Sequence, residues 1–359
     1  VSGAIWIAQQ AGYNNLLTFD MGGTSTDVSL VLNGRAAQSR ETTVGDVTVR
    51  ASSVDVRTVG AGGGSIAHVP ELTGALRVGP QSAGAEPGPA AYDKGGVEPT
   101  VTDANVALGY MPPNVRLGGD MKIRKDLAVD AVKTVADPLG LSVQAAAAGI
   151  YDIVNENMYG ALRLVSVEKG FDPRDFALIG FGGAGPLHAN ALGKLTNSWP
   201  VIIPPGPGVL CAYGDVTTTI QDEASMSFIR RFSDTNKKEV VQIFTDLSKK
   251  ASKTLDAEGV AKKNRTTTYQ VDIRYHGQGL LLTVDFDLSE LKRKGLNAIG
   301  NTFDEMHEQL FTFALPAEKE LVNLRAVVRD KALSVKAPSV PRGNYNPSGA
   351  FISKTKVFM

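Results

Sequence analysis

The sequence predicts an α/β lobe followed by a smaller α+β domain, and three observations support this. Between residues 142 and 203, helical and strand patterns alternate, which is typical of an α/β sheet. Of the 38 glycines, 31 lie before residue 226 and seven after it, which indicates backbone brought close to a ligand in the first part. Beyond residue 225 the patterns become those of an ordinary α+β domain. We therefore expect a lobe over 1–225, a domain over 226–336 and a linker or tail over 337–359.

Local patterns justify each element of the first lobe. Residues 16–19 predict a short buried strand, and residues 27–34 predict its hairpin partner, which ends in an Asn-Gly turn signal. Ser142 can serve as N-cap for a helix over 142–169, where apolar residues recur at helical spacing. The remaining elements expected here are a strand at 176–181, a helix at 186–195, a strand at 201–203 and a loop-rich stretch at 57–120.

The second domain is expected to contain long helices and strands. The predicted elements are a helix at 236–257, strands at 266–275 and 280–286, a helix at 301–314 and a strand at 320–335. The Pro-, Ser-, Gly- and Asn-rich stretch at 337–350 is expected to be a linker.

Composition excludes several classes of protein. Lys plus Arg and Asp plus Glu both number 37, so the chain lacks the net positive charge typical of a nucleic-acid partner. No run of about 18 apolar residues occurs, so we expect no membrane-spanning helix. Cys211 is the only cysteine, which excludes disulfides within the chain. With no secretory signal visible at the N-terminus, a reducing, cytoplasmic setting is expected.

The first candidate site follows the first strand, at Phe19-Asp20-Met21-Gly22-Gly23-Thr24. Two glycines let the backbone approach a ligand, and successive N–H groups in such a turn form an anion-binding concavity. Asp20 is placed to hold Mg²⁺, directly or through its waters, because Mg²⁺ prefers oxygen ligands. A glycine-rich hairpin turn capped by an Asp remains the alternative interpretation.

The second candidate is Gly182-Gly183-Ala184-Gly185-Pro186, between a predicted strand and a predicted helix. Glycines at this position permit a flat ring or a phosphate to lie near a helix N-terminus. A tight strand–helix turn explains this segment about as well. Together, the two loops resemble the nucleotide site of actin, sugar kinases and Hsp70, although only one hairpin loop of that kind is present.

Several other residues have a functional and a structural interpretation. Asp103 is a candidate catalytic or metal-binding residue and, equally, a helix cap. His188, which follows the second glycine loop, either faces the ligand or packs the helix, and His68 has the same two interpretations. Cys211 is expected to be a small core residue.

Taken in order, these motifs resemble the A-type subunit of the hydantoinase/5-oxoprolinase family. The matching segments are residues 19–28, 59–65, 79–89, 99–105, 165–176, 181–188 and 204–210, with 274–278 and 321–325 in the second domain. The resemblance implies an actin-like ATPase fold. It also implies ATP-driven opening of a cyclic amide, as in hydantoin or 5-oxoproline, through phosphorylation of a carbonyl oxygen. It further implies a B-type partner subunit.

The resemblance also assigns roles to residues. It implies that Asp20 binds Mg²⁺ or positions water, that Gly22, Gly23 and Thr24 contact the phosphates of ATP, and that three glycines flank adenosine. Those glycines are Gly182, Gly183 and Gly185. Asp103 and His188 are carried over as further catalytic residues of the cleft.

Two departures from the family pattern shape the expected function. Family chains usually begin with another lobe, which carries a first Asp-x-Gly-Gly-Thr hairpin, and extend further at the C-terminus. We therefore expect a family member truncated at both ends or one half of a split protein, with weak or no ATP turnover in isolation. Two alternatives stay open: the ATPase subunit of an acetone- or acetophenone-type carboxylase acting on a ketone, and a non-catalytic ATP-binding fragment.

Overall fold

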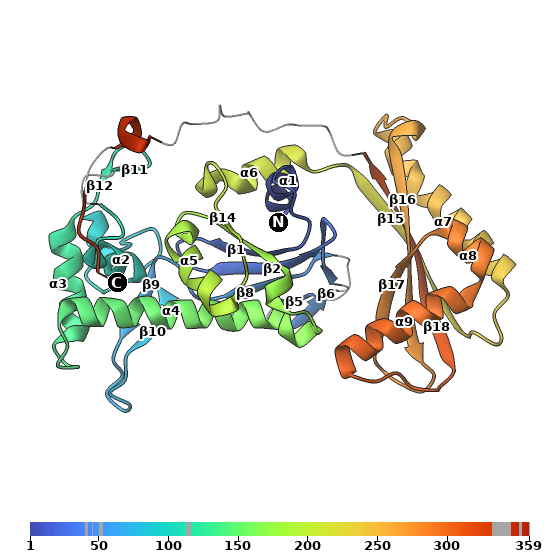
Figure 1. Cartoon of the computed structure of the whole chain (residues 1–359), viewed down its shortest axis with the longest axis horizontal. Coiled ribbons are helices and arrows are strands. Elements are labelled where there is room, and N and C mark those ends of the chain that lie inside the picture. The colour runs from blue at the N-terminus through green and yellow to red at the C-terminus, as the bar shows by residue number, and fades with distance from the viewer. Residues whose placement is uncertain are drawn as a thin grey trace. The chain divides into compact units, whose positions relative to one another are not determined.

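The computed structural model describes residues 1–39, 42–44, 46–49, 53–112, 116–331, 346–351 and 354–358. The chain forms two compact units, one comprising Val1–Val216 with the end of the chain from Lys336, the other Thr217–Val335 (Figure 1). Each unit has a hydrophobic core of its own. Among the helices of the described residues, none combines the length and the apolar character that crossing a bilayer requires.

A mixed sheet lies at the centre of unit 1, with the strand order β14-β13-β1-β2-β3 and with β8 paired to β2. Its strands are β1 (Leu16–Met21), β2 (Thr26–Leu32), β3 (Arg35–Ala36), β8 (Val56–Val59), β13 (Ala177–Phe181) and β14 (Val201–Ile202). β1 is antiparallel to β2 and parallel to β13, which is parallel to β14. The predicted hairpin and both later strands are thus confirmed.

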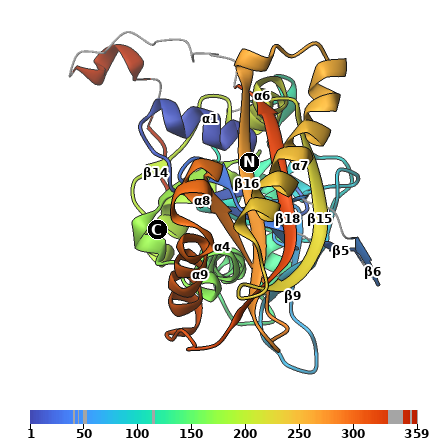
Figure 2. The same ribbon diagram turned by 90° about the vertical axis from the view of Figure 1, so that its right-hand side faces the viewer.

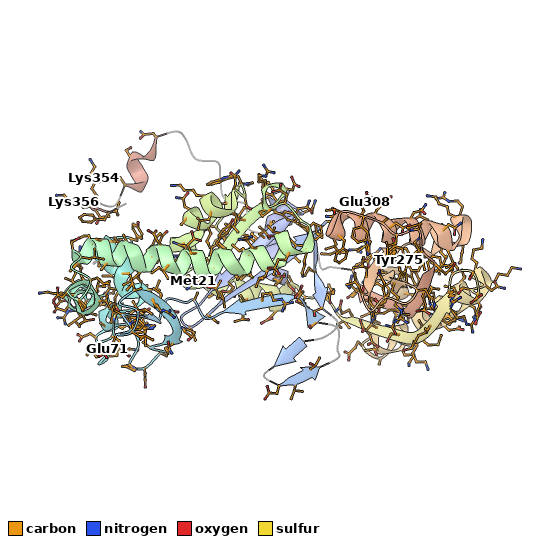
Figure 3. The ribbon with its side chains drawn as sticks, turned by 90° about the horizontal axis from the view of Figure 1, so that it is seen from below. Met21, Glu71, Tyr275, Glu308, Lys354 and Lys356 are labelled. Carbon is orange, nitrogen blue, oxygen red and sulfur yellow. The ribbon has the colours of Figure 1, made fainter. Side chains whose placement is uncertain are left out.

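Helices cover both faces of this sheet. The helices of unit 1 are α1 (Ser2–Gln10), α2 (Val101–Leu108), α3 (Lys125–Ala136), α4 (Val143–Val165), α5 (Gly185–Thr196) and α6 (Leu210–Thr217). In Figure 1, α4 runs below the sheet, and α1 and α6 lie above it. The core on the α4 side includes Met21, which Figure 3 labels, and the core on the α6 side includes Leu16. Because strand side chains alternate between faces, Asp20 points to the α6 side with Leu16.

The long helix α4 begins where the sequence predicts. Ser142 accepts a hydrogen bond from the Ala145 N–H at 3.2 Å, as an N-cap does. The α-helix ends at Val165, and a 3₁₀ turn over Val167–Lys169 continues to Gly170, whose φ is +76°. The predicted helix over 142–169 is therefore confirmed, with a tighter last turn.

Other parts of unit 1 differ from the prediction. The stretch expected to be rich in loops contains β9 (Ser65–His68), β10 (Arg77–Ser82) and the buried helix α2. Helices α1, α3 and α6 were not predicted. The short strands are β4 (Gln38–Ser39), β5 (Thr42–Val44), β6 (Val47–Val49), β7 (Ser53–Val54), β11 (Arg116–Leu117) and β12 (Met121–Lys122).

Unit 2 is an antiparallel sheet with three helices on one face (Figure 2). Its strands, in sheet order, are β15 (Gln221–Arg231), β18 (Lys319–Asp330), β16 (Arg265–Tyr275) and β17 (Leu282–Phe286), and its helices are α7 (Lys237–Ala257), α8 (Leu288–Lys294) and α9 (Leu296–Phe311). Tyr275, labelled in Figure 3, is buried here and donates to Asp304 Oδ1 at 2.7 Å. The α+β character of this region agrees with the prediction.

The boundary between the units lies before the expected position at residue 225. β15 crosses that position and pairs with β18 from Gln221 to Arg231, so the whole strand belongs to unit 2. Part of the expected tail, residues 337–345, lies outside the described residues. Near its end, the Phe358 N–H donates to the Leu108 carbonyl at 2.9 Å, so this segment contacts the C-terminus of α2 in unit 1.

Candidate functional site

The turn between β1 and β2, residues 22–25, presents amide groups that the protein does not use. The Gly22 N–H closes the turn by donating to the Ser25 carbonyl at 3.0 Å. In the described part of the chain, the N–H groups of Gly23, Thr24 and Ser25 have no acceptor. Gly23 and Thr24 are exposed. Successive free amides in a tight turn form an anion-binding concavity.

A second glycine loop, residues 60–64 between β8 and β9, lies behind this turn. The N–H groups of Gly63 and Gly64 donate to the carbonyls of Gly22 and Gly23, at 3.0 and 2.5 Å. A Cβ on Gly62 would lie 2.6 Å from the Thr24 carbonyl carbon, so only glycine fits there. These bonds occupy the turn's carbonyls and leave its amides available. The sequence marked this loop as part of the family pattern, but we did not predict it as part of the site.

The third glycine loop, residues 182–185, follows β13 and lies beside the end of β1. The Ala184 N–H donates to the Met21 carbonyl at 3.0 Å. Gly182 has φ +84°, and a Cβ there would lie 2.4 Å from Asp20 Oδ1. Parallel pairing of β1 with β13 therefore brings together the two glycine motifs that the sequence singled out, with Gly185 at the start of α5.

Asp20 has a second carboxylate beside it. Asp20 of β1 is directly opposite Asp27 of β2, so both side chains lie on one face of the sheet. Asp27 Oδ1 accepts from the Thr58 hydroxyl at 2.6 Å, and Asp20 Oδ2 accepts from the Cys211 thiol at 3.2 Å. Like charges facing each other are unfavourable, and a cation would relieve this. We did not predict Asp27 as a site residue, although hairpin register was sufficient to find it.

Cys211 is not the core residue that we expected. The residue is exposed in α6, and partial desolvation of its thiol, together with the hydrogen bond to Asp20, raises the pKa of Cys211. Its contact with Asp20 joins α6 to the end of β1. In the described residues, no group of three or more His, Cys, Asp or Glu side chains is arranged to hold a metal ion. A divalent cation here would therefore need ligands from water or a bound phosphate, which is the mode that Mg²⁺ favours.

Space remains where a ligand would approach. A Cβ added to Gly23 or to Gly183 would meet no atom within 4 Å, and neither residue has a positive φ. Internal packing therefore does not require glycine at either position. Both positions leave open space beside the glycine loops.

Asp103 has a structural role in place of the predicted catalytic one. It is fully buried at the N-terminus of α2, where it forms a capping box with Thr100. Its carboxylate accepts from the Thr100 N–H and hydroxyl at 2.9 and 2.7 Å, and from the N–H groups of Ala90 and Ala91 at 3.2 and 2.8 Å. Four donors fill the acceptor sites of one carboxylate, so none remains for a substrate or metal. Burial raises the pKa of Asp103 although these hydrogen bonds oppose the shift.

Replacing Asp103 with Asn is expected to lower the free energy of unfolding of unit 1 by about 2 kcal/mol, because an amide nitrogen would face backbone donors. Urea unfolding followed by tryptophan fluorescence measures this, since both tryptophans, Trp6 and Trp199, lie in unit 1. Asp126→Asn is the matched control, because its partner Arg124 is also exposed and such pairs contribute little. Full stability of Asp103→Asn with loss of ligand binding would restore the catalytic interpretation.

His188 is buried and uses both ring nitrogens within the protein. Nδ1 lies 3.0 Å from Asn155 Oδ1, and Nε2 lies 3.1 Å from Asn105 Nδ2. Because Asn155 Nδ2 donates to the Tyr151 carbonyl, its Oδ1 is the acceptor, so His188 carries its proton on Nδ1. The ring stacks on Tyr151 at 4.8 Å between centroids. Desolvation lowers the His188 pKa to about 3, so the residue is neutral and joins α2, α4 and α5 instead of facing a cleft.

A separate hollow of about 410 Å³ lies at the opposite edge of the sheet. Residues preceding β1 and β13, including Asn15 and Phe176, line it together with Trp199. The glycine loops, by contrast, follow the carboxyl ends of β1 and β13, where open α/β sheets bind their ligands. The hollow is therefore distinct from the candidate site.

The fold is that of a mixed α/β protein, and its candidate site is a turn with unused amides next to a pair of carboxylates. A family model described as hydantoinase/oxoprolinase matches residues 1–224. The caprolactamase subunit alpha of Pseudomonas jessenii is 41% identical over 90% of this chain and 47% of its own length. The acetophenone carboxylase gamma subunit of Aromatoleum aromaticum is 33% identical over 99% of this chain and 50% of its own length.

Structural comparison agrees. The crystal structure of an ATP-dependent caprolactamase from Pseudomonas jessenii matches 96% of this chain and 50% of that chain, with a TM-score of 0.87 and 38% identity. The chain belongs to the hydantoinase/oxoprolinase family, as predicted. It spans about half the length of these relatives.

Proposed function

We propose that this chain is the ATP-binding part of a subunit that hydrolyses a cyclic amide at the expense of ATP. The observation that supports this proposal best is the group of three free amides at Gly23, Thr24 and Ser25, which lies beside Asp20. Two glycines of the loops, Gly23 and Gly183, have no packing role. Such amides suit phosphate oxygens. The parallel strands and the β1–β2 hairpin are consistent with one lobe of an actin-like ATPase, which is the fold we propose for unit 1.

Asp20 and Asp27 are the residues that would hold Mg²⁺, since their carboxylates share one face of the hairpin. When bound, the ion would supply positive charge that neutralises phosphate oxygens. The amides of the turn would bind and orient the phosphate chain. Gly182, Gly183 and Gly185 would form the adenosine side of the site, with Gly182 holding the backbone against Asp20.

The proposed reaction is phosphorylation of the amide carbonyl oxygen, with ATP as donor. ADP leaves as the phosphoryl group is transferred, and the carbonyl carbon becomes more electrophilic. Water then attacks this carbon, the carbon–nitrogen bond of the ring breaks with a proton passing to the nitrogen, and phosphate is released, so that the products are the ring-opened acid, ADP and phosphate. Positioning and charge neutralisation account for most catalysis of phosphoryl transfer. We propose that two further parts complete the site. One is a B-type subunit, and the other is a lobe that corresponds to the half of the relatives' sequences that this chain does not match. The relative named an ATP-dependent caprolactamase supports a cyclic amide as substrate.

The second candidate function is the ATPase subunit of a carboxylase that acts on a ketone. The match to the acetophenone carboxylase gamma subunit, which covers 99% of this chain and 50% of that subunit, favours it. ATP hydrolysis by the assembled complex distinguishes the two functions. Stimulation by hydantoin, 5-oxoproline or caprolactam without bicarbonate supports the amidohydrolase, whereas stimulation by a ketone only with bicarbonate supports the carboxylase.

Binding of Mg·ATP to the purified chain tests the proposed site directly. We expect Asp20→Asn to weaken the Mg²⁺-dependent part of ATP affinity about tenfold, because it removes one carboxylate charge next to the metal. Isothermal titration with and without Mg²⁺ measures this. Asp93→Asn, at an exposed carboxylate that pairs with Arg124, is the control and should bind as wild type. Equal affinity of Asp20→Asn and wild type under both conditions would exclude Asp20 as a metal ligand.

A further inference from the structure

Ser82, at the end of β10, lies beside the free amides of the turn 22–25. Its Oγ accepts from the Gly84 N–H at 3.2 Å and donates to Thr24 Oγ1 at 3.4 Å. The Ala83 N–H donates to the Gly64 carbonyl at 2.8 Å, and a Cβ on Gly64 would lie 3.0 Å from Ser82 Oγ. The loop at 60–64, whose amides bind the carbonyls of the turn, therefore also holds Ser82 next to Thr24.

The hydroxyl protons of this group can be accounted for one by one. A serine hydroxyl has one proton, and Ser82 directs it to Thr24 while its own lone pair accepts from Gly84. Thr24 Oγ1, having accepted, retains its own proton, which has no acceptor within the described residues. The Thr24 side chain is exposed. Its hydroxyl is thus a fourth unused donor beside the amides of Gly23, Thr24 and Ser25.

We propose that Ser82 is a positioning residue that turns the Thr24 hydroxyl proton toward a phosphoryl oxygen of a bound nucleoside triphosphate. The inference rests on the proposed function, because it assumes that the turn binds phosphate. A chain of hydrogen bonds from the Gly84 N–H through Ser82 to Thr24 polarises each successive hydroxyl and makes the last one a better donor. Neither Ser82 nor the loop that holds it needs to touch the ligand.

A double-mutant cycle between Ser82 and Thr24 tests this inference. Isothermal titration of Mg·ATP into the full chain is expected to show that Ser82→Ala weakens affinity roughly fivefold, the size of one neutral hydrogen bond. Ser82→Thr, which keeps the hydroxyl, should restore most of the affinity. In a Thr24→Ala background, Ser82→Ala should change affinity less than twofold, because the hydroxyl that it orients is gone. Thermal unfolding should be the same for all four proteins of the cycle.

The possible outcomes separate this inference from the proposed function. A fivefold loss in both backgrounds would mean that Ser82 acts independently of Thr24, and no loss in either would mean that it does not act on the ligand; each overturns the inference alone. If the wild-type chain binds neither Mg·ATP nor inorganic tripolyphosphate, the proposed function and the inference are both overturned. Coupling between the two residues supports both.

Discussion

Replacing Gly23 with Ala is expected to weaken Mg·ATP binding about a hundredfold while leaving the melting temperature of the protein unchanged or slightly raised. The added methyl group meets no protein atom within 4 Å, and Gly23 does not have a positive φ, so the folded chain accepts it. Alanine also lowers the conformational entropy of the unfolded chain, which favours folding slightly. The methyl group would instead occupy the space beside the free amides, where overpacking costs about 3 kcal/mol. Isothermal titration and thermal unfolding measure the two effects.

Two comparisons make this prediction specific. Gly279→Ala in unit 2 is the matched control, because that glycine also lacks a positive φ and any atom near its added Cβ. It should leave binding unchanged and, like Gly23→Ala, leave stability unchanged or slightly raised. Gly62→Ala should destabilise unit 1, because its Cβ would collide with the backbone of Gly23 and Thr24. Wild-type affinity in Gly23→Ala would show that no phosphate lies against this turn.

The elements with a regular local pattern were predictable from sequence. The β1–β2 hairpin has a buried strand and a glycine turn, and the Asn-Gly signal at 33–34 forms the following turn, between β2 and β3. Helix α4 has a capping Ser142 and apolar residues at helical spacing. The two glycine motifs were found for the same reason, since a strand followed by glycines and then a helix or strand is a local signature. That they meet follows from the parallel pairing of β1 with β13, which no local pattern specifies.

Helices without a two-sided pattern were missed. Every residue of α2 is buried, so its sequence shows no alternation of apolar and polar faces, and its polar residues resemble a site. Helix α3 was also missed, but for a different reason. Ala128, Val132 and Val135 form a regular apolar face, so the sequence contained the pattern needed to predict this helix. The domain boundary was expected at residue 225, although the last glycine of the glycine-rich part is Gly214. Strand pairing assigns the whole of β15 to unit 2 and so places the boundary earlier.

Long-range contacts explain the misassigned site residues. Asp103 and His188 have the chemistry of catalytic groups, but their partners satisfy them inside the fold. His188 contacts Asn155 and Asn105, which are 33 and 83 positions away in the sequence. Conversely, Asp27, Ser82 and the loop at 60–64 join the site only through strand register and loop packing. Sequence thus singled out two of the glycine loops of the candidate site, and tertiary structure showed that Asp103 and His188 are satisfied by partners inside the fold.

Below neutral pH, His188 is expected to destabilise unit 1 strongly. Its pKa is about 3 in the folded protein, because burial disfavours the charged ring, and its ordinary value is 6.5. Between these two values the unfolded chain binds one more proton than the folded chain, so stability rises with pH. The contribution is fully present above pH 6.5 and is lost as pH falls. From pH 7.5 to pH 4.5 the free energy of unfolding should fall by about 2.7 kcal/mol through this residue.

Urea unfolding of unit 1, followed by the fluorescence of Trp6 and Trp199 between pH 4.5 and pH 7.5, measures this dependence. His188→Gln should be less stable than wild type at pH 7, because it cannot fill both hydrogen bonds and the stack on Tyr151. The free energy of unfolding of His188→Gln should nevertheless fall less steeply with acid than that of the wild type. The two slopes should differ by up to about 1.4 kcal/mol per pH unit. His276→Gln, at an exposed histidine in unit 2, should keep the wild-type slope. If His188→Gln keeps that slope too, His188 is not a neutral residue of the interior, and a role in proton transfer at the site returns to consideration.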